Sequence, residues 1–205
     1  MQSERYSGEI MMQVHHVTVS LGPVNEREAL RYARCDEGDM QVLSLLRECE
    51  REMGAAQARV CYMQLPCSVT EKECDFGLFS VASRDLAKNL QGCKSAILFA
   101  ATLGMEADRL IARHQLLSPA KAMLLQALGA ERIENGCDAF CAQLKAEGLQ
   151  LRPRFSPGYG DVALSVQKDF FRVLQCDRLL GLYLNDSLLM SPSKSVTAFI
   201  GVEGE

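Results

Sequence analysis

The fold is decided by residues 118–148, which read SPAKAMLLQALGAERIENGCDAFCAQLKAEG. Ser118 can cap a helix, and Pro119 suits the first helical position because a proline there loses no hydrogen bond. Helical patterning then continues to the end of the stretch, where Gly148 can serve as a C-terminal cap. We therefore predict one long helix over residues 118–147.

Three small residues, Ala122, Gly129 and Gly136, recur at every seventh position of this helix. At that spacing they share one face and leave a smooth groove along it. A glycine inside a helix lowers the stability of the helix by about 1 kcal/mol relative to alanine, and such a glycine usually allows another segment to pack closely. We expect a neighbouring segment to pack closely there, and a ligand in the groove is the alternative.

The segments around the long helix alternate between strand and helix patterns. Apolar, β-branched runs predict strands, and capped amphipathic runs predict helices. The predicted strands cover residues 11–19, 58–65, 75–82 and 93–102, and residues 181–202 hold a strand, a turn region and a final strand. The predicted helices begin at Asn25, at about Gly38 and at Ser83, and a fourth covers residues 163–175. We expect one α+β domain over residues 1–205, with a mostly antiparallel sheet and flanking helices.

The composition argues against several classes of protein. The chain has 205 residues, of which 48% are hydrophobic and 23% are charged, as in ordinary globular proteins. The net charge of −4 lacks the basic footprint of a nucleic-acid binder. The first ten residues do not resemble a signal peptide, and the most apolar stretch, residues 96–103, is too short to cross a bilayer. We expect a cytoplasmic protein without nucleic-acid or membrane partners.

The nine cysteines form no recognisable metal or disulfide pattern, because their number is odd and no Cys-x-x-Cys occurs. Cys137 and Cys141 share a helix face, but two thiols without a nearby histidine make a poor zinc site. His15 and His16 are adjacent in a predicted strand, so they point to opposite faces. We expect buried, reduced thiols and no metal site.

The richest candidate site is the loop that begins at Arg154 and reads RFSPGYGD. Arg154 offers a fixed fork of donors for a carboxylate, and Pro157 stiffens the loop. Gly158 and Gly160 allow a ligand to touch the main chain, and Tyr159 between them can stack on an adenine or attract a cation. S-adenosylmethionine carries a carboxylate, an adenine and a sulfonium. A plain surface turn is the alternative that composition alone favours.

The same loop matches the dinucleotide-binding pattern G-x-G-x-x-A from Gly158 to Ala163, with Asp186 at a plausible distance. No clean apolar strand precedes Gly158, and Pro157 stands where that strand should end. The chain after Asp186 is too short to complete a doubly wound sheet. We therefore reject nucleotide binding of that kind.

Two blocks of the sequence resemble a known family. Arg154-Phe-Ser-Pro-Gly-Tyr159 resembles the Arg-x-x-Pro-Gly-Tyr signature of the activation domain of cobalamin-dependent methionine synthase. The segment NDSLLMSPSKSV, residues 185–196, is similar to that family's Thr-Glu-Ser-x-x-Met-x-Pro-x-x-Ser-Val. Residues 25–32 and 100–104 are similar to short, single-domain members. Where larger members carry Pro-Ala-Cys-Pro after the Gly-Tyr, this chain has residues 160–163, Gly-Asp-Val-Ala.

This resemblance implies a C-shaped α+β fold with a twisted antiparallel sheet that binds S-adenosylmethionine. It implies an acidic pair on the long helix, formed by Glu131 with either Glu134 or Asn135. The implied ligand-binding residues are Arg154, Ser156, Pro157, Gly158 and Tyr159. A second implied set, Ser187, Met190 and Ser195, would mainly brace the loop. No residue of the chain is implied to be catalytic.

The resemblance also implies a partner, because the chain has no cobalamin-binding or methyl-transfer domain of its own. The partner would be a cobalamin-binding methionine synthase that lacks its own activation domain, with flavodoxin or another reductant supplying an electron. Bound S-adenosylmethionine would then methylate the reduced cobalamin. A reactivation factor for a different corrinoid methyltransferase is one alternative, and a non-catalytic S-adenosylmethionine-binding protein is another. A relic that keeps the fold without the ligand is disfavoured by the retained Arg154, Gly158 and Tyr159.

Overall fold

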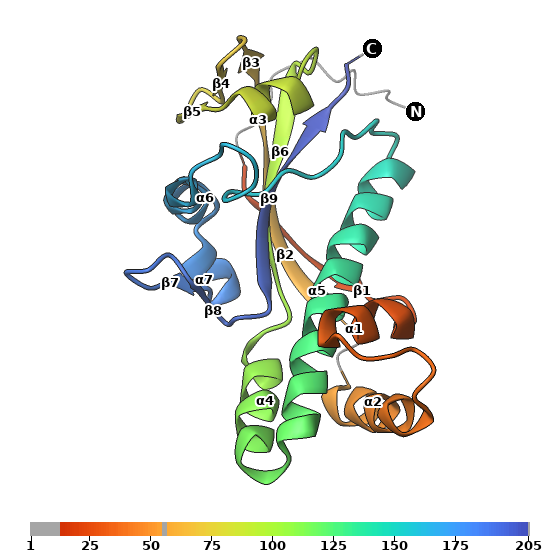
Figure 1. Ribbon diagram of the computed structural model, residues 1–205. Coiled ribbons are helices and arrows are strands. Elements are labelled where there is room, and N and C mark those ends of the chain that lie inside the picture. Colours follow the sequence, from red (N-terminus) through yellow and green to blue (C-terminus); the bar gives the residue numbers. More distant parts are fainter. Residues whose placement is uncertain (1–12, 55–56, 205) are drawn as a thin grey trace, which may run out of the picture.

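A computed structural model describes residues 13–54 and 57–204 (Figure 1). At its centre is a twisted antiparallel sheet whose strands lie in the order β1-β2-β6-β9. These strands are β1 (His15–Ser20), β2 (Gln57–Pro66), β6 (Ser95–Thr102) and β9 (Ser195–Val202). The strand predicted over residues 11–19 begins at His15, and its first two residues lie outside the described chain.

Helices cover both faces of this sheet, which explains the unbroken apolar run of β6. All eight of its residues are buried. Ile97 and Phe99 point toward α5 (Pro119–Ala146), and Leu98 between them joins the cluster on the opposite face. A central strand buried on both sides has no need of polar positions. Figure 1 shows α5 on one side of the sheet and α6 and α7 on the other.

The long helix α5 confirms the prediction over residues 118–147, and its small residues pack closely as expected. A Cβ added at Gly136 would lie 2.8 Å from the Cβ of Ala58 on β2, so only glycine allows this approach. A Cβ at Gly129 would lie 2.9 Å from the side chain of Lys194, which crosses the helix there. The groove is therefore filled by the protein itself.

A separate helical layer surrounds the first half of α5. It consists of α1 (Glu26–Ala33), α2 (Met40–Met53) and α4 (Met105–Leu117). The predicted cap of α1 is confirmed, because the Asn25 side chain accepts a hydrogen bond of 3.2 Å from Glu28 N. The sequence did not predict α4, and no side chain caps its first turn.

The opposite face of the sheet is covered by α3 (Arg84–Asn89), α6 (Gln167–Leu174) and α7 (Cys176–Leu180). The helix predicted over residues 163–175 is confirmed. It opens with a 3₁₀ turn, Leu164–Val166, and ends where Gln175 adopts a φ of 50°. That left-handed residue turns the chain between α6 and α7.

Short strands complete the fold. The strand predicted over residues 75–82 is instead a hairpin of β4 (Glu73–Asp75) and β5 (Ser80–Ala82), to which β3 (Ser68–Val69) adds a third strand. Gly77 turns this hairpin with a φ of 77°, and Asp75 accepts a hydrogen bond from its N–H. Residues 181–202 were predicted to hold one strand, a turn region and a final strand. The final strand is β9, but the first is instead a hairpin of β7 (Tyr183–Leu184) and β8 (Met190–Ser191).

Within the described residues, no helix combines the length and the apolar character needed to span a membrane. The same part of the chain contains no cluster of three or more His, Cys, Asp or Glu side chains arranged to hold a metal ion. All nine cysteines are unpaired thiols, and only Cys35 and Cys141 are partly exposed.

Candidate functional site

The loop that carries Arg154 is fixed to the free edge of β9. Arg152 N donates to Gly201 O at 2.8 Å, and Phe155 and Phe199 exchange backbone hydrogen bonds of 3.0 and 2.8 Å. The loop thereby behaves as a short additional strand, in which neighbouring side chains point to opposite sides. Phe155 packs into the core under α6, and Arg154 points the other way, toward α5.

Arg154 lies between two carboxylates of α5. Its Nη2 donates to Glu134 Oε2 at 2.9 Å, and its Nη1 lies 2.8 Å from Asp138 Oδ1 without hydrogen-bond geometry. Burial works against the charge of this side chain, but Cys137, Asp138 and Glu134 together outweigh it and raise the pKa of Arg154. The guanidinium is thus held in place while one of its nitrogens keeps unused donors.

One side of Arg154 faces a hollow between α1 and α5, which we call the acidic hollow. Its volume is about 340 Å³. The lining residues are Asn25, Glu28, Tyr32, Glu131, Glu134, Asn135, Asp138 and Arg154. Four carboxylates face one guanidinium there, so the hollow favours a positively charged group such as an ammonium or a sulfonium.

Glu131 is the most buried of these carboxylates, at 3% exposure. Its Oε1 accepts a hydrogen bond of 3.1 Å from Asn25 N. Its Oε2 is buried without a hydrogen bond from any described residue, and the nearest cation is Arg132 Nη1 at 3.7 Å. A buried acceptor left unsatisfied costs about 1–3 kcal/mol, so a donor from a ligand would be favoured here.

The hollows continue along the loop beyond Arg154. A middle hollow of about 310 Å³ is lined by Asp138, Cys141, Lys145, Leu151, Arg152, Pro153 and Arg154. A third, the tyrosine hollow, has about 460 Å³ and is lined by Asp85, Lys88, Asn89, Arg152, Pro153, Phe155, Tyr159 and Gly160. Each shares residues with the next, so the three hollows adjoin one another in a row along the loop, and we call this row the depression. Its length suits an extended ligand with chemically different ends.

The Pro-Gly-Tyr segment forms a tight turn at the far end of this depression. Tyr159 N donates to Ser156 O at 3.1 Å, and Gly158 N donates to Val162 O at 2.9 Å. Gly158 adopts a φ of 89°, which residues with a side chain rarely reach. Pro157 is buried beneath the turn, whereas Tyr159 is 72% exposed. The tyrosine ring is therefore open to solvent and not packed in the core.

The turn is anchored to α3 from its other end. Asp161 accepts hydrogen bonds from the Ser83 hydroxyl and from Arg84 N, the latter at 2.8 Å. These bonds, that of Ser83 first, lower the pKa of the Asp161 carboxyl. A Cβ at Gly160 would overlap the Asp85 carboxylate, so this close approach requires glycine. The backbone around Tyr159 is therefore fixed by both β9 and α3.

The second set of expected residues lies elsewhere. Ser187 is exposed in the turn between β7 and β8, and Met190 packs against the core under α7. Ser195 is buried at the start of β9, where its hydroxyl lies 2.8 Å from Thr102 Oγ1 and from Pro192 O. None of the three lines a hollow beside the loop in the described structure. Ser195 secures the strand to which the loop is attached.

Sequence reasoning missed the α1 side of the site. Asn25, Glu28 and Tyr32 reach the acidic hollow from a helix more than a hundred positions away from Glu131, so no local motif joins them. Asp138 was detectable, because it extends the acidic helix face one turn beyond Glu134.

No protein-family model matches the chain, and no curated protein sequence matches it either. Among solved structures, the chain is similar to the crystal structure of the MetH reactivation domain bound to AdoHcy. The TM-score is 0.64 and the sequence identity is 13%, over 93% of this chain and 78% of that chain. The two proteins share a fold, which agrees with the fold that the sequence resemblance implies.

Proposed function

We propose that this protein binds S-adenosylmethionine along the depression and supports the reductive methylation of cob(II)alamin on a separate cobalamin-dependent methionine synthase. The observation that carries the proposal is the placement of Arg154, held beside the acidic hollow with donors unused, on a fold similar to a reactivation domain that binds AdoHcy.

The chemistry of the depression fits the parts of this ligand. Its carboxylate would bind the Arg154 guanidinium, and its ammonium would lie toward Glu131 and Glu134. Its adenine would extend to the tyrosine hollow and stack on Tyr159. Arg154 would exchange Asp138, which is 75% exposed, for the ligand carboxylate. That exchange costs little, because ion pairs open to water contribute about 0–1 kcal/mol.

In this proposal the protein binds and orients the methyl donor, and the partner supplies the corrinoid cofactor as methyl acceptor. The fixed backbone around Tyr159 holds the donor at a defined angle over the partner, which is a proximity effect. An external reductant, such as flavodoxin, supplies the electron.

Two measurements test the proposal in turn. Calorimetric titration with S-adenosylmethionine should show saturable binding to the intact protein. Adding the protein, S-adenosylmethionine and a reductant to an oxidised methionine synthase without an activation domain should then restore methionine formation, and Arg154→Gln should not. Absence of binding at millimolar ligand, both alone and with the corrinoid partner, would contradict the binding role. Binding without reactivation of that enzyme would reject this partner.

A further inference from the structure

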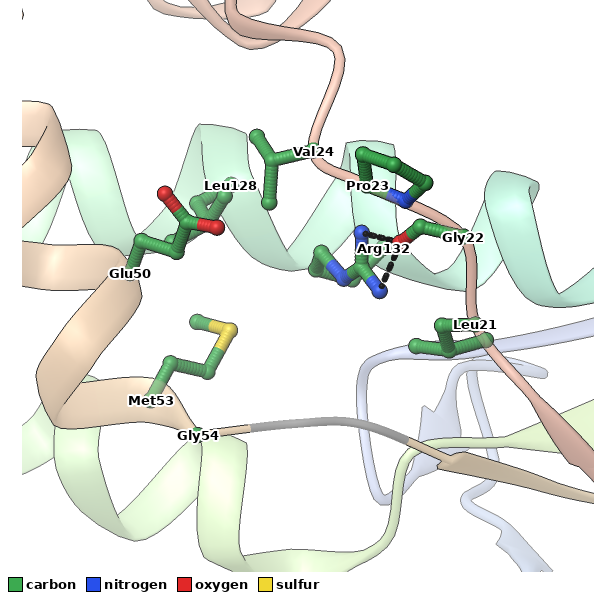
Figure 2. A pocket seen from close by; sticks show the side chains of 9 residues that line it. All are labelled: Leu21, Gly22, Pro23, Val24, Glu50, Met53, Gly54, Leu128 and Arg132. Atoms are coloured by element: carbon green, nitrogen blue, oxygen red, sulfur yellow. Dashed lines mark hydrogen bonds between the residues drawn. The ribbon is translucent and has the colours of Figure 1, made fainter.

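A further hollow, separate from the three beside the loop, lies next to the segment that connects β1 to α1 (Figure 2). We call residues 21–24 the strap and this space the strap hollow. The strap separates it from the acidic hollow, so the two are distinct. Its volume is about 240 Å³. The lining residues are Leu21, Gly22, Pro23, Val24, Glu50, Met53, Gly54, Leu128 and Arg132.

A buried cation stands on one side of the strap hollow. Arg132 is 5% exposed, and its Nη1 and Nη2 both donate to Gly22 O at 3.0 Å. Glu131 Oε2 lies 3.7 Å from Nη1, beyond hydrogen-bond distance. Among the described residues, Arg132 donates hydrogen bonds only to Gly22 O, so most of its five N–H groups remain unused. A guanidinium with spare donors at the wall of a cavity is suited to a carboxylate.

The carboxylate of Glu50 lies on the side of the strap hollow opposite Arg132. Figure 2 shows the Glu50 carboxylate pointing from α2 into the same space, opposite Arg132. The walls between them are apolar, formed by side chains that include Val24, Met53 and Leu128. Two opposite charges separated by an apolar surface match a zwitterion that carries an apolar side chain. The volume of about 240 Å³ leaves room for a molecule the size of a free amino acid.

We propose that the strap hollow binds a free α-amino acid with an apolar side chain. Its carboxylate bonds to Arg132, its ammonium faces Glu50, and its side chain packs against Met53 and Leu128. This inference does not depend on S-adenosylmethionine binding, because it uses a separate space and separate side chains.

Leucine analogues that lack one charged group test the roles of Arg132 and Glu50 without changing the protein. L-leucine should bind the intact protein saturably in calorimetry. 3-Methylbutylamine, which lacks the carboxylate, should bind at least about tenfold more weakly, because it cannot accept a charge-assisted hydrogen bond from the unused donors of Arg132. 4-Methylpentanoate, which lacks the ammonium, should bind only about threefold more weakly, because Glu50 is exposed.

The variant Glu50→Gln adds the protein side of a double-mutant cycle. It should weaken L-leucine about threefold and leave 4-methylpentanoate unchanged, whereas Glu71→Gln, an exposed glutamate outside the hollow, should change neither. The inference is wrong if L-leucine fails to bind at millimolar concentration. It is also wrong if the amine binds as well as leucine, or if Glu50→Gln weakens both ligands equally.

Discussion

The substitution Arg154→Gln tests the central feature of the proposed site. A charge-assisted hydrogen bond contributes about 1.5–3 kcal/mol, so its loss should weaken S-adenosylmethionine about ten- to 150-fold. The fold should survive, because Glu134 and Asp138 are 45% and 75% exposed and their ion pairs with Arg154 add little stability. Calorimetry on the folded variant measures the loss directly.

The ligand 5′-methylthioadenosine sharpens this test, because it keeps the adenosine and lacks the carboxylate and the ammonium. Its affinity should be the same for the intact protein and for Arg154→Gln. Arg109→Gln, an exposed arginine on α4, is the matched control and should change neither ligand. If Arg154→Gln weakens both ligands equally, or weakens neither, then Arg154 does not bind the carboxylate and our reasoning fails.

Three further predictions concern neighbouring residues. Asp138→Asn should strengthen S-adenosylmethionine binding a few-fold, because it removes the carboxylate that competes for Arg154; weaker binding in calorimetry would indicate that Asp138 itself contacts the ligand. Gly136→Ala should destabilise the protein by about 1–3 kcal/mol in urea unfolding, because the new Cβ would clash with β2. Gly129→Ala should be near neutral, because its Cβ would meet only the flexible side chain of Lys194. Equal effects of the two substitutions would contradict the close approach of α5 to β2 at Gly136. Asp161→Asn should lower the melting temperature near neutral pH. The pKa of Asp161 is lowered in the folded protein, so the ionised carboxylate stabilises the fold above the pKa of a free aspartate, about 3.9. This stabilisation is lost as the pH falls through the lowered pKa, so the difference in melting temperature between the two proteins should close in acid. A gap that persists there would show that charge is not the cause.

The elements that sequence predicted well carry their own local signals. The long helix has a proline at its first position, α1 has a capping asparagine, and β6 is an unbroken apolar run. Elements without such signals were missed or merged. No side chain caps α4, and α7 was missed because it follows α6 across a turn that depends on one left-handed residue, Gln175, which is not a glycine.

The same division applies to the site. Its loop is continuous in sequence, so Arg154 and Tyr159 could be identified from their spacing, while the acidic hollow exists only because α1 packs on α5. The structure also separates these two side chains, since Arg154 lines the acidic and middle hollows and Tyr159 lines the tyrosine hollow. A ligand that reaches both must therefore lie along the loop and not across it.

The charge distribution on α5 argues for a cationic ligand from a different direction. Glu131, Glu134 and Asp138 face the same hollow, and like charges on one helix face repel each other. Arg154 offsets this repulsion only in part, because it contacts Glu134 and Asp138 alone. Arg132 lies 3.7 Å from Glu131, beyond hydrogen-bond distance, and one buried oxygen of Glu131 has no hydrogen bond. A cation bound in the acidic hollow would relieve this repulsion, which is the electrostatic argument for the ligand that we propose.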